Sequence, residues 1–139
     1  MNNHALPQPS EREVAEAASR IVEAFAATDT ERYFSGFATD ASFIFHSEQS
    51  RLEGRAAYEA MWSEWVASGW TVIACDSTNQ HVTVFAGGAV FSHDVATTVR
   101  TSDGEESYRE RETIVFRCEP DGALLAVHEH LSPSPARTA

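Results

Sequence analysis

The stretch that decides the fold is "RETIVFRCEPDGALLAVHEHLS", Arg111–Ser132. It holds two runs rich in apolar and β-branched residues, separated by the dipeptide Asp121-Gly122. Asp-Gly between two such runs is typical of tight hairpin turns, because its residues accept positive φ angles. The stretch therefore predicts two antiparallel strands joined by a hairpin.

The same pattern extends upstream to Trp70. Gly87-Gly88 and Asp103-Gly104 punctuate this half of the chain. The segments between such turn signals alternate or are rich in β-branched residues, which indicates strands. We expect an antiparallel meander with strands over Thr71–Asn79, His81–Phe85, Ala89–Thr101, Glu106–Cys118 and Ala123–Ser132.

The first half of the chain reads mainly as helix. Ser10 and Glu13 in "SERE" form a capping box, followed by apolar residues at helical spacing up to about Ala27. "TDTERYFSGF" predicts a short second helix stopped by Gly36, "ASFIFHS" predicts a strand, and "RLEGR" a turn. A third helix is expected from about Arg55 to Ser68, ended by Gly69.

Helices that are segregated from an antiparallel sheet define the α+β class. We expect three helices packed on one face of a curved antiparallel sheet, with a small-molecule pocket in the mouth of the resulting cone. Residues 10–133 are expected to form one domain, between a flexible N-terminal arm over 1–9 and a flexible tail over 134–139.

Composition excludes some partners. The chain carries 21 acidic and 10 basic residues, a formal charge of -11. This excess argues against nucleic acid and against anionic membranes, since both are bound through clusters of Lys and Arg. The N-terminus lacks the features of a signal peptide, and Cys75 and Cys118 are expected to be reduced, so a cytoplasmic location is expected.

Three segments resemble a known superfamily: "YFSGFATDASFIFH", "RLEGRAAYEAMW" and the Arg111–Ser132 stretch. Together with the amphipathic first helix they are similar to the nuclear transport factor 2-like superfamily, in its SnoaL-like and ketosteroid-isomerase-like branch. The last stretch also resembles the end of the calcium/calmodulin-dependent kinase II association domain. The resemblance implies a cystatin-like α+β cone and a homodimer paired through the sheet.

Side chains alternate between the two faces of a strand, which sorts the candidate residues. The bulkier, more apolar sets are expected to face the cavity: Phe91, His93, Val95, Thr97 and Val99; Tyr108, Glu110, Glu112, Ile114 and Phe116; Leu125, Val127, Glu129 and Leu131. His128 and His130 then face outward, although one bulge would invert that assignment.

The preferred hypothesis is a cofactor-free enzyme that transfers protons on a compact organic molecule, as an isomerase, dehydratase or cyclase. His93 would act as base with Glu112 or Glu129 as partner, because imidazole titrates near neutrality and burial raises the pKa of a carboxyl group. The residues expected to bind substrate are His46 near the mouth, and Phe45, Tyr58, Trp62, Trp65, Thr97 and Tyr108.

Two alternatives stay open. The chain could be a non-catalytic module that binds a small metabolite or dimerises, with the tryptophans serving only as core. It could also be a metal-dependent hydrolase that uses His128 and His130, although a tight site needs a third or fourth ligand and only Asp94 shares that face.

Overall fold

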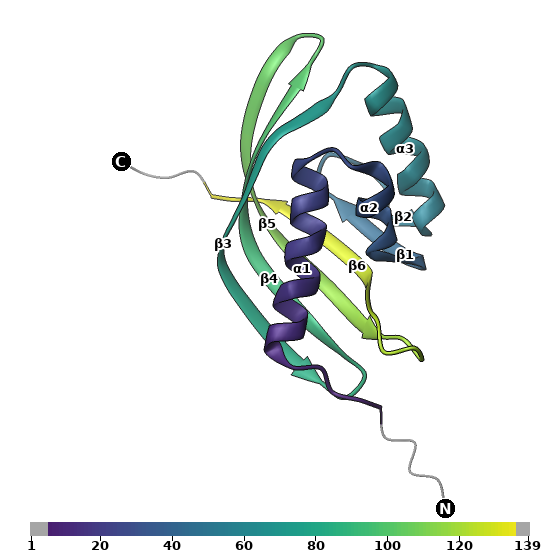
Figure 1. Cartoon of the computed structure of the whole chain (residues 1–139). Helices are drawn as coiled ribbons and strands as arrows, with labels where there is room; N and C mark the ends of the chain where they lie inside the picture. The colour runs from purple at the N-terminus through teal and green to yellow at the C-terminus, as the bar shows by residue number, and fades with distance from the viewer. Residues whose placement is uncertain (1–5, 136–139) are drawn as a thin grey trace, which may run out of the picture.

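The computed structural model describes residues 6–135, so part of the expected arm (1–5) and tail (136–139) lies outside the described residues. The elements follow the expected order along the chain (Figure 1). They are α1 (Glu11–Ala26), α2 (Thr30–Ser35), β1 (Phe37–Phe45), β2 (Leu52–Glu53), α3 (Arg55–Ala67), β3 (Thr71–Phe85), β4 (Gly88–Thr101), β5 (Gly104–Cys118) and β6 (Leu124–Pro133).

The helix boundaries confirm the predicted start and stop signals. At the start of α1, Ser10 Oγ accepts a hydrogen bond from the Glu13 amide at 3.0 Å, and the Ser10 amide donates to Glu13 Oε1 at 2.9 Å. At the end of α3, Gly69 has a φ of 99° and the Trp70 amide donates to the Trp65 carbonyl. This Schellman turn uses a conformation that glycine adopts at little cost.

The sheet is mixed, which corrects the expectation of a wholly antiparallel one. Its order is β2-β1-β6-β5-β4-β3, and the meander from β3 to β6 is antiparallel as predicted. β6, however, runs parallel to β1. The chain leaves β1, passes through α3 and the meander, and returns beside β1 in the same direction. The segment expected to be only a turn contains the two-residue strand β2, which pairs with β1.

Two irregularities shape the long strands. β3 is one strand rather than two: the expected break is a register shift between Thr78 and His81, where Asn79 adopts a φ of 54°. In β6, Val115 pairs with His128 but Phe116 pairs with Ala126, so Val127 is an extra residue. This is a β-bulge, which changes the face that the strand presents.

The bulge corrects part of the predicted facing of β6. Before it, Leu124 and Ala126 pack into the core, rather than Leu125 and Val127 as expected. After it, Glu129 is buried on the inner face, as expected, and His128 and His130 face the other way. The inner sets predicted for β4 and for Glu112, Ile114 and Phe116 of β5 are buried and thus confirmed.

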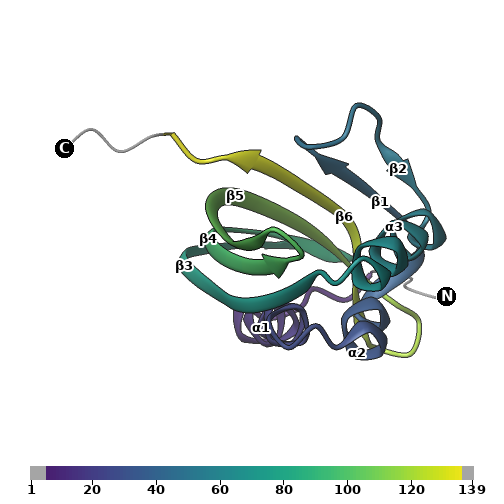
Figure 2. The ribbon, with the colours of Figure 1, turned by 90° about the horizontal axis from the view of Figure 1, so that it is seen from above.

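The helices cover the concave face of the sheet. Figures 1 and 2 show α1 lying across the inside of the curved β3-β4-β5 layer, with α2 and α3 closing the end near β1. Aromatic side chains from α2, β1 and α3 fill this end with edge and stacked contacts, which exclude water. Of the helices that the structure describes, none combines the length and apolar character that crossing a membrane requires.

Candidate active site

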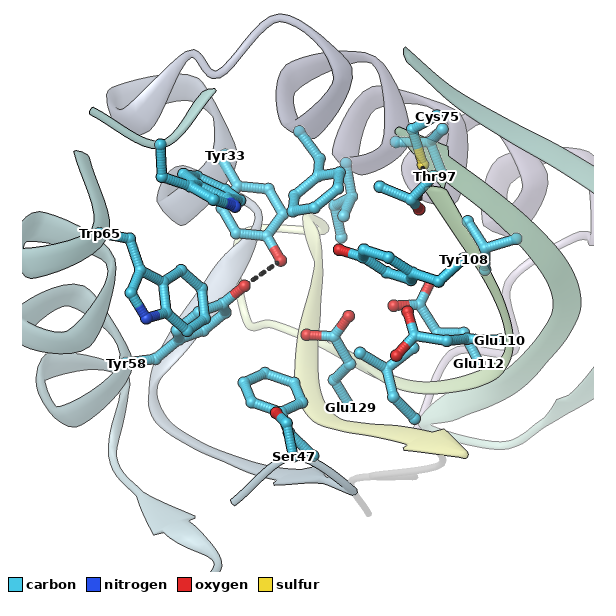
Figure 3. A pocket seen from close by; sticks show the side chains of 17 residues that line it. Tyr33, Ser47, Tyr58, Trp65, Cys75, Thr97, Tyr108, Glu110, Glu112 and Glu129 are labelled. Carbon is cyan, nitrogen blue, oxygen red and sulfur yellow. Dashed lines mark hydrogen bonds between the residues drawn. The ribbon is translucent and has the colours of Figure 1, made fainter. Parts of the chain in front are cut away.

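A cavity of about 110 Å³ opens between the helices and the inner face of the sheet. One water needs roughly 10–15 Å³, so the cavity has room for a compact organic molecule. Its wall is apolar on the helix side and carries ionisable groups on the sheet side (Figure 3). The described lining residues are Ile21, Val22, Phe25, Tyr33, Phe45, Ser47, Tyr58, Trp65, Trp70, Cys75, Val95, Thr97, Tyr108, Glu110, Glu112, Glu129 and Leu131.

The three predicted catalytic side chains come from neighbouring strands. His93 on β4 lies opposite Glu112 on β5, and Glu129 on β6 lies opposite Ile114, two residues further along. All three are buried. His93 Nε2 and Glu112 Oε1 are 2.6 Å apart, a charge-assisted distance if the imidazole carries the proton at this nitrogen. The register of the meander therefore creates the His–carboxylate pair.

His93 is not among the residues that line the cavity, and its role as base stays a prediction. Its side chain is fully buried behind Glu112, with Nδ1 2.5 Å from Ser77 Oγ on β3. Ser77 in turn accepts a hydrogen bond from the Gln80 side chain. His93 is therefore clamped between a serine and a carboxylate. Glu112, rather than His93, presents an ionisable group to the cavity.

Glu112 and Glu129 lie close enough for their protonation to be linked. Burial, the nearby Glu112 charge and a hydrogen bond with Glu112 raise the pKa of Glu129 well above its usual value. Burial also acts to raise the pKa of Glu112, but hydrogen bonds from Glu129 and His93 outweigh it and lower that pKa. Two adjacent carboxyl groups whose pKa values are pushed apart supply one acid and one base at the same pH.

Oε1 of Glu129 is buried and has no hydrogen-bond partner within the described part of the chain. Figure 3 shows the Glu129 carboxyl group pointing into the cavity, between Tyr58 on one side and Glu112 on the other. An unpaired buried polar atom costs about 1–3 kcal/mol, so a native protein retains one mainly where a ligand or water pairs with it. Glu129 thus marks the polar end of the cavity.

Tyr33 and Tyr58 face this end from α2 and α3. Their hydroxyl oxygens are 3.0 Å apart and both side chains are buried (Figure 3). Burial, and next the Glu129 charge, raise the pKa of both tyrosines well above the usual value, so both remain neutral. When one hydroxyl donates to the other, a single hydrogen is left over, and it can be donated to a ligand oxygen.

A third carboxyl group, Glu110, lies nearer the mouth. His46 Nε2 is 2.5 Å from Glu110 Oε2. His46, which was predicted near the mouth, therefore contacts a lining residue but is not itself one of the residues that line the cavity. Burial raises the pKa of Glu110. Burial also raises the pKa of Cys75 to about 11 and of Tyr108 to about 12, so neither is ionised near neutral pH.

The predicted substrate wall is partly supported. Phe45, Tyr58, Trp65, Thr97 and Tyr108 line the cavity. Trp62 is not one of the lining residues: it is fully buried, stacks on Tyr33 and donates its indole N–H to Thr30 at 2.8 Å. Its place on α3 points it into the aromatic core behind the cavity.

The two outward histidines of β6 differ in their surroundings. His128 Nδ1 is 2.8 Å from Ser42 Oγ, and burial lowers the pKa of His128. His130 is exposed beside it, with ring centroids 6.2 Å apart. Among residues 6–135, no three His, Cys, Asp or Glu side chains gather as metal ligands.

Sequence reasoning missed Tyr33, Trp70 and Cys75 as lining residues. Tyr33 lies in a helix of six residues, which is too short to show a periodic face. Trp70 directly precedes β3 and Cys75 lies within it, and only the register with β4 fixes which face of β3 is the inner one. The strand alternation did place Glu110, Val95 and Leu131 on the inner face, and all three line the cavity.

A curved mixed sheet closed by helices around a polar-ended cavity defines the small-molecule-binding α+β cone domains. The chain belongs to the SnoaL-like domain family, whose model matches residues 14–137. Among curated protein sequences, none shows significant similarity.

Solved structures share the fold. A nuclear transport factor 2-like superfamily protein from Salmonella enterica serovar Typhimurium superposes with a TM-score of 0.78, 19% identity and 92% coverage of each chain. An NTF2-like protein with a cystatin-like fold from Novosphingobium aromaticivorans gives 0.69, 20% identity, and 88% and 80% coverage of this chain and that one. The association domain of C. elegans CaMKII gives 0.70, 15% identity, and 88% and 94% coverage. These likenesses confirm the cystatin-like α+β cone.

Proposed function

We propose that the chain is a cofactor-free enzyme that moves protons on a compact organic molecule, in a reaction of the isomerase, dehydratase or cyclase type. The observation that carries the proposal is the pair of buried carboxyl groups at one end of the cavity, Glu112 held by His93 and Glu129 with a free oxygen. Burying a carboxyl group away from water costs free energy, so two linked carboxyl groups are not expected in a cavity with only a structural role.

In the proposed reaction, Glu112 is the base. Its carboxylate takes a proton from a carbon next to a substrate carbonyl, and the electron pair of the broken C–H bond moves into an enolate. Return of the proton to a different carbon gives isomerisation, whereas departure of a neighbouring hydroxyl group as water gives dehydration. A positioned general base contributes typically 10²–10⁴-fold to the rate.

The remaining polar groups have supporting roles. The Tyr33–Tyr58 pair donates its spare hydrogen to the enolate oxygen, and the proton that Glu112 and Glu129 share is available for return to the substrate. His93 is a positioning residue, since it contacts Glu112 and lies outside the cavity. Phe45 and Trp65 keep water away from the reacting carbon.

Hydrogen–deuterium exchange tests this chemistry without knowledge of the natural substrate. Compact cyclic ketones, with and without an amino group, are incubated with the protein in D₂O, and loss of the α-proton signal is followed by NMR. We expect wild type to accelerate exchange and Glu112→Gln to lose about 10²-fold or more of that acceleration. The control Glu23→Gln removes an exposed charge on α1 and should leave it unchanged.

Exchange at the buffer rate, for ketones whose binding to the cavity is shown by chemical shifts of the lining residues, would overturn the proposal. Equal rates in wild type and Glu112→Gln would do the same. In either case the non-catalytic binding module becomes the better description of this chain.

A homodimer is part of the same proposal. The outer sheet face carries Val90, Val115 and His128 in register across three strands, each only half-buried in the single chain. The fold is shared with a domain that is named an association domain in C. elegans CaMKII. A cytoplasmic location, supported by the free thiols of Cys75 and Cys118, completes the proposal.

A further inference from the structure

We infer that the ligand of this cavity is a compact organic cation: an apolar ring or short chain that carries a protonated amine. The inference rests on the proposed function only in so far as that function requires a ligand in this cavity. It adds the charge of the ligand, which the proton-transfer chemistry leaves open.

The first observation is the sign of the charged groups. Glu110, Glu112 and Glu129 all line the cavity, and the described lining includes neither lysine nor arginine. His46, the cationic group nearest the mouth, is already paired with Glu110. An anionic ligand would enter without a counter-charge, and burying an unpaired charge is expensive. The cavity therefore discriminates against carboxylates and phosphates.

The second observation is the aromatic wall. Five aromatic residues line the same cavity: Phe25 on α1, Tyr58 and Trp65 on α3, Trp70 just after α3, and Phe45 on β1. Tyr58 meets Trp65 edge-on and Trp65 lies tilted against Trp70, with centroids 6.2 Å and 5.3 Å apart. The faces of such rings attract ammonium groups by about 0.5–2 kcal/mol each, most strongly where water is excluded.

The third observation is the free acceptor. Glu129 is 2% exposed, and its Oε1 points into the cavity without a donor in the described chain. An ammonium N–H pairs with this oxygen directly, whereas a ketone or an ether has no hydrogen to offer. The same ammonium group would be held by the neighbouring carboxyl groups, and its hydrocarbon part would contact the rings.

A shape-matched series of probes isolates the effect of charge. Cyclohexylamine, cyclohexanol and cyclohexanecarboxylate share one ring and differ in carrying a positive, a neutral or a negative group. Affinities are measured by calorimetry on the full chain at fixed ionic strength. We expect the amine to bind at least tenfold more tightly than the alcohol, and the carboxylate to bind most weakly.

Because the whole chain has a charge of -11, the site must be separated from the general attraction of cations. Glu112→Gln removes the inward charge and Glu110→Gln removes the one at the mouth, and each should weaken the amine at least fivefold with little effect on the alcohol. Glu23→Gln removes an equal charge from the exposed face of α1 and should change nothing. Thermal melts and a one-dimensional NMR spectrum verify that the variants fold.

The outcomes distinguish this inference from the proposed function. Tight binding of the amine with no ketone exchange upholds the ligand class and overturns the enzyme. Exchange with a neutral ketone, together with equal affinities for amine and alcohol, upholds the enzyme and overturns the ligand class. Equal weakening of the amine by Glu112→Gln and Glu23→Gln would also overturn it, because the attraction would then come from the surface.

Discussion

Glu129 is a buried carboxyl group with a strongly raised pKa. Its pKa is raised by burial and by Glu112, so the folded state binds a proton that the unfolded state releases above about pH 4.5. A raised folded-state pKa gives stability that is complete below the unfolded pKa and is lost as pH rises toward the folded pKa. Glu129 therefore makes the protein less stable at neutral than at acid pH.

Replacing Glu129 with glutamine should remove this pH dependence. The amide keeps the shape and hydrogen-bonding capacity of the protonated acid but cannot ionise. We expect Glu129→Gln to unfold at higher urea concentration than wild type at pH 7–8, and the difference to shrink as the pH is lowered toward 4.5. A difference that stays constant with pH would show that Glu129 is ionised in the folded protein.

His93 contacts Glu112 on the side away from the cavity. Removing the imidazole should leave the buried Glu112 carboxylate without this partner. We expect His93→Ala to cost about 1–3 kcal/mol in the free energy of unfolding, because Glu112 loses a donor, and Glu112→Gln in that background to recover part of the loss. His81→Ala, at an exposed histidine, should stay within about 0.5 kcal/mol of wild type. Additive effects of the His93 and Glu112 substitutions would show that the two groups are energetically independent.

Single residues reveal how far the site could be predicted. Strand alternation was sufficient to place Glu112, Glu129 and His93 on one face, because period two is a local property. It could not show that His93 is covered by Glu112, because that depends on side-chain direction and on Ser77 from another strand. Tyr33 was not predicted for a related reason, because a helix of six residues is too short to show a periodic face.

At the scale of elements, capping chemistry should account for part of the stability of α1. Ser10→Ala removes the hydroxyl that accepts from the Glu13 amide and should cost about 1 kcal/mol, measured by urea denaturation. Ser19→Ala, on the exposed face of the same helix, should be neutral or slightly stabilising, because alanine is the better helix former. Similar losses from both substitutions would contradict a role for the cap.

The elements themselves were largely predictable, whereas their pairing was less so. The helix caps, Gly69 and the Asp-Gly turns are local signals, and the element boundaries that they predict are confirmed by the observed helices and meander. The parallel pairing of β1 with β6 is a contact across most of the chain, which no local pattern encodes. The sequence analysis noted that a bulge would invert the facing of β6, but it did not predict its position at Val127, because that position depends on the register with β5.

At the scale of the whole molecule, the outer sheet face should join two copies of the chain. Sedimentation velocity is expected to give about twice the mass of one chain. Val115→Lys places a charge at the centre of that face, away from the core, and should shift the protein to a monomer with little loss of stability. Thr98→Lys, nearer the edge of the same face, serves as control. A wild-type monomer would exclude this interface.

The central claim is that Glu129 holds a proton inside the cavity at neutral pH, beside an ionised Glu112. Infrared spectroscopy tests it directly through the C=O stretch of a protonated carboxyl group, which is distinct from that of a carboxylate. We expect this band to persist at pH 7 in wild type, to shift in D₂O and to disappear in Glu129→Gln. A wild-type spectrum at pH 7 that contains only carboxylate bands would contradict it.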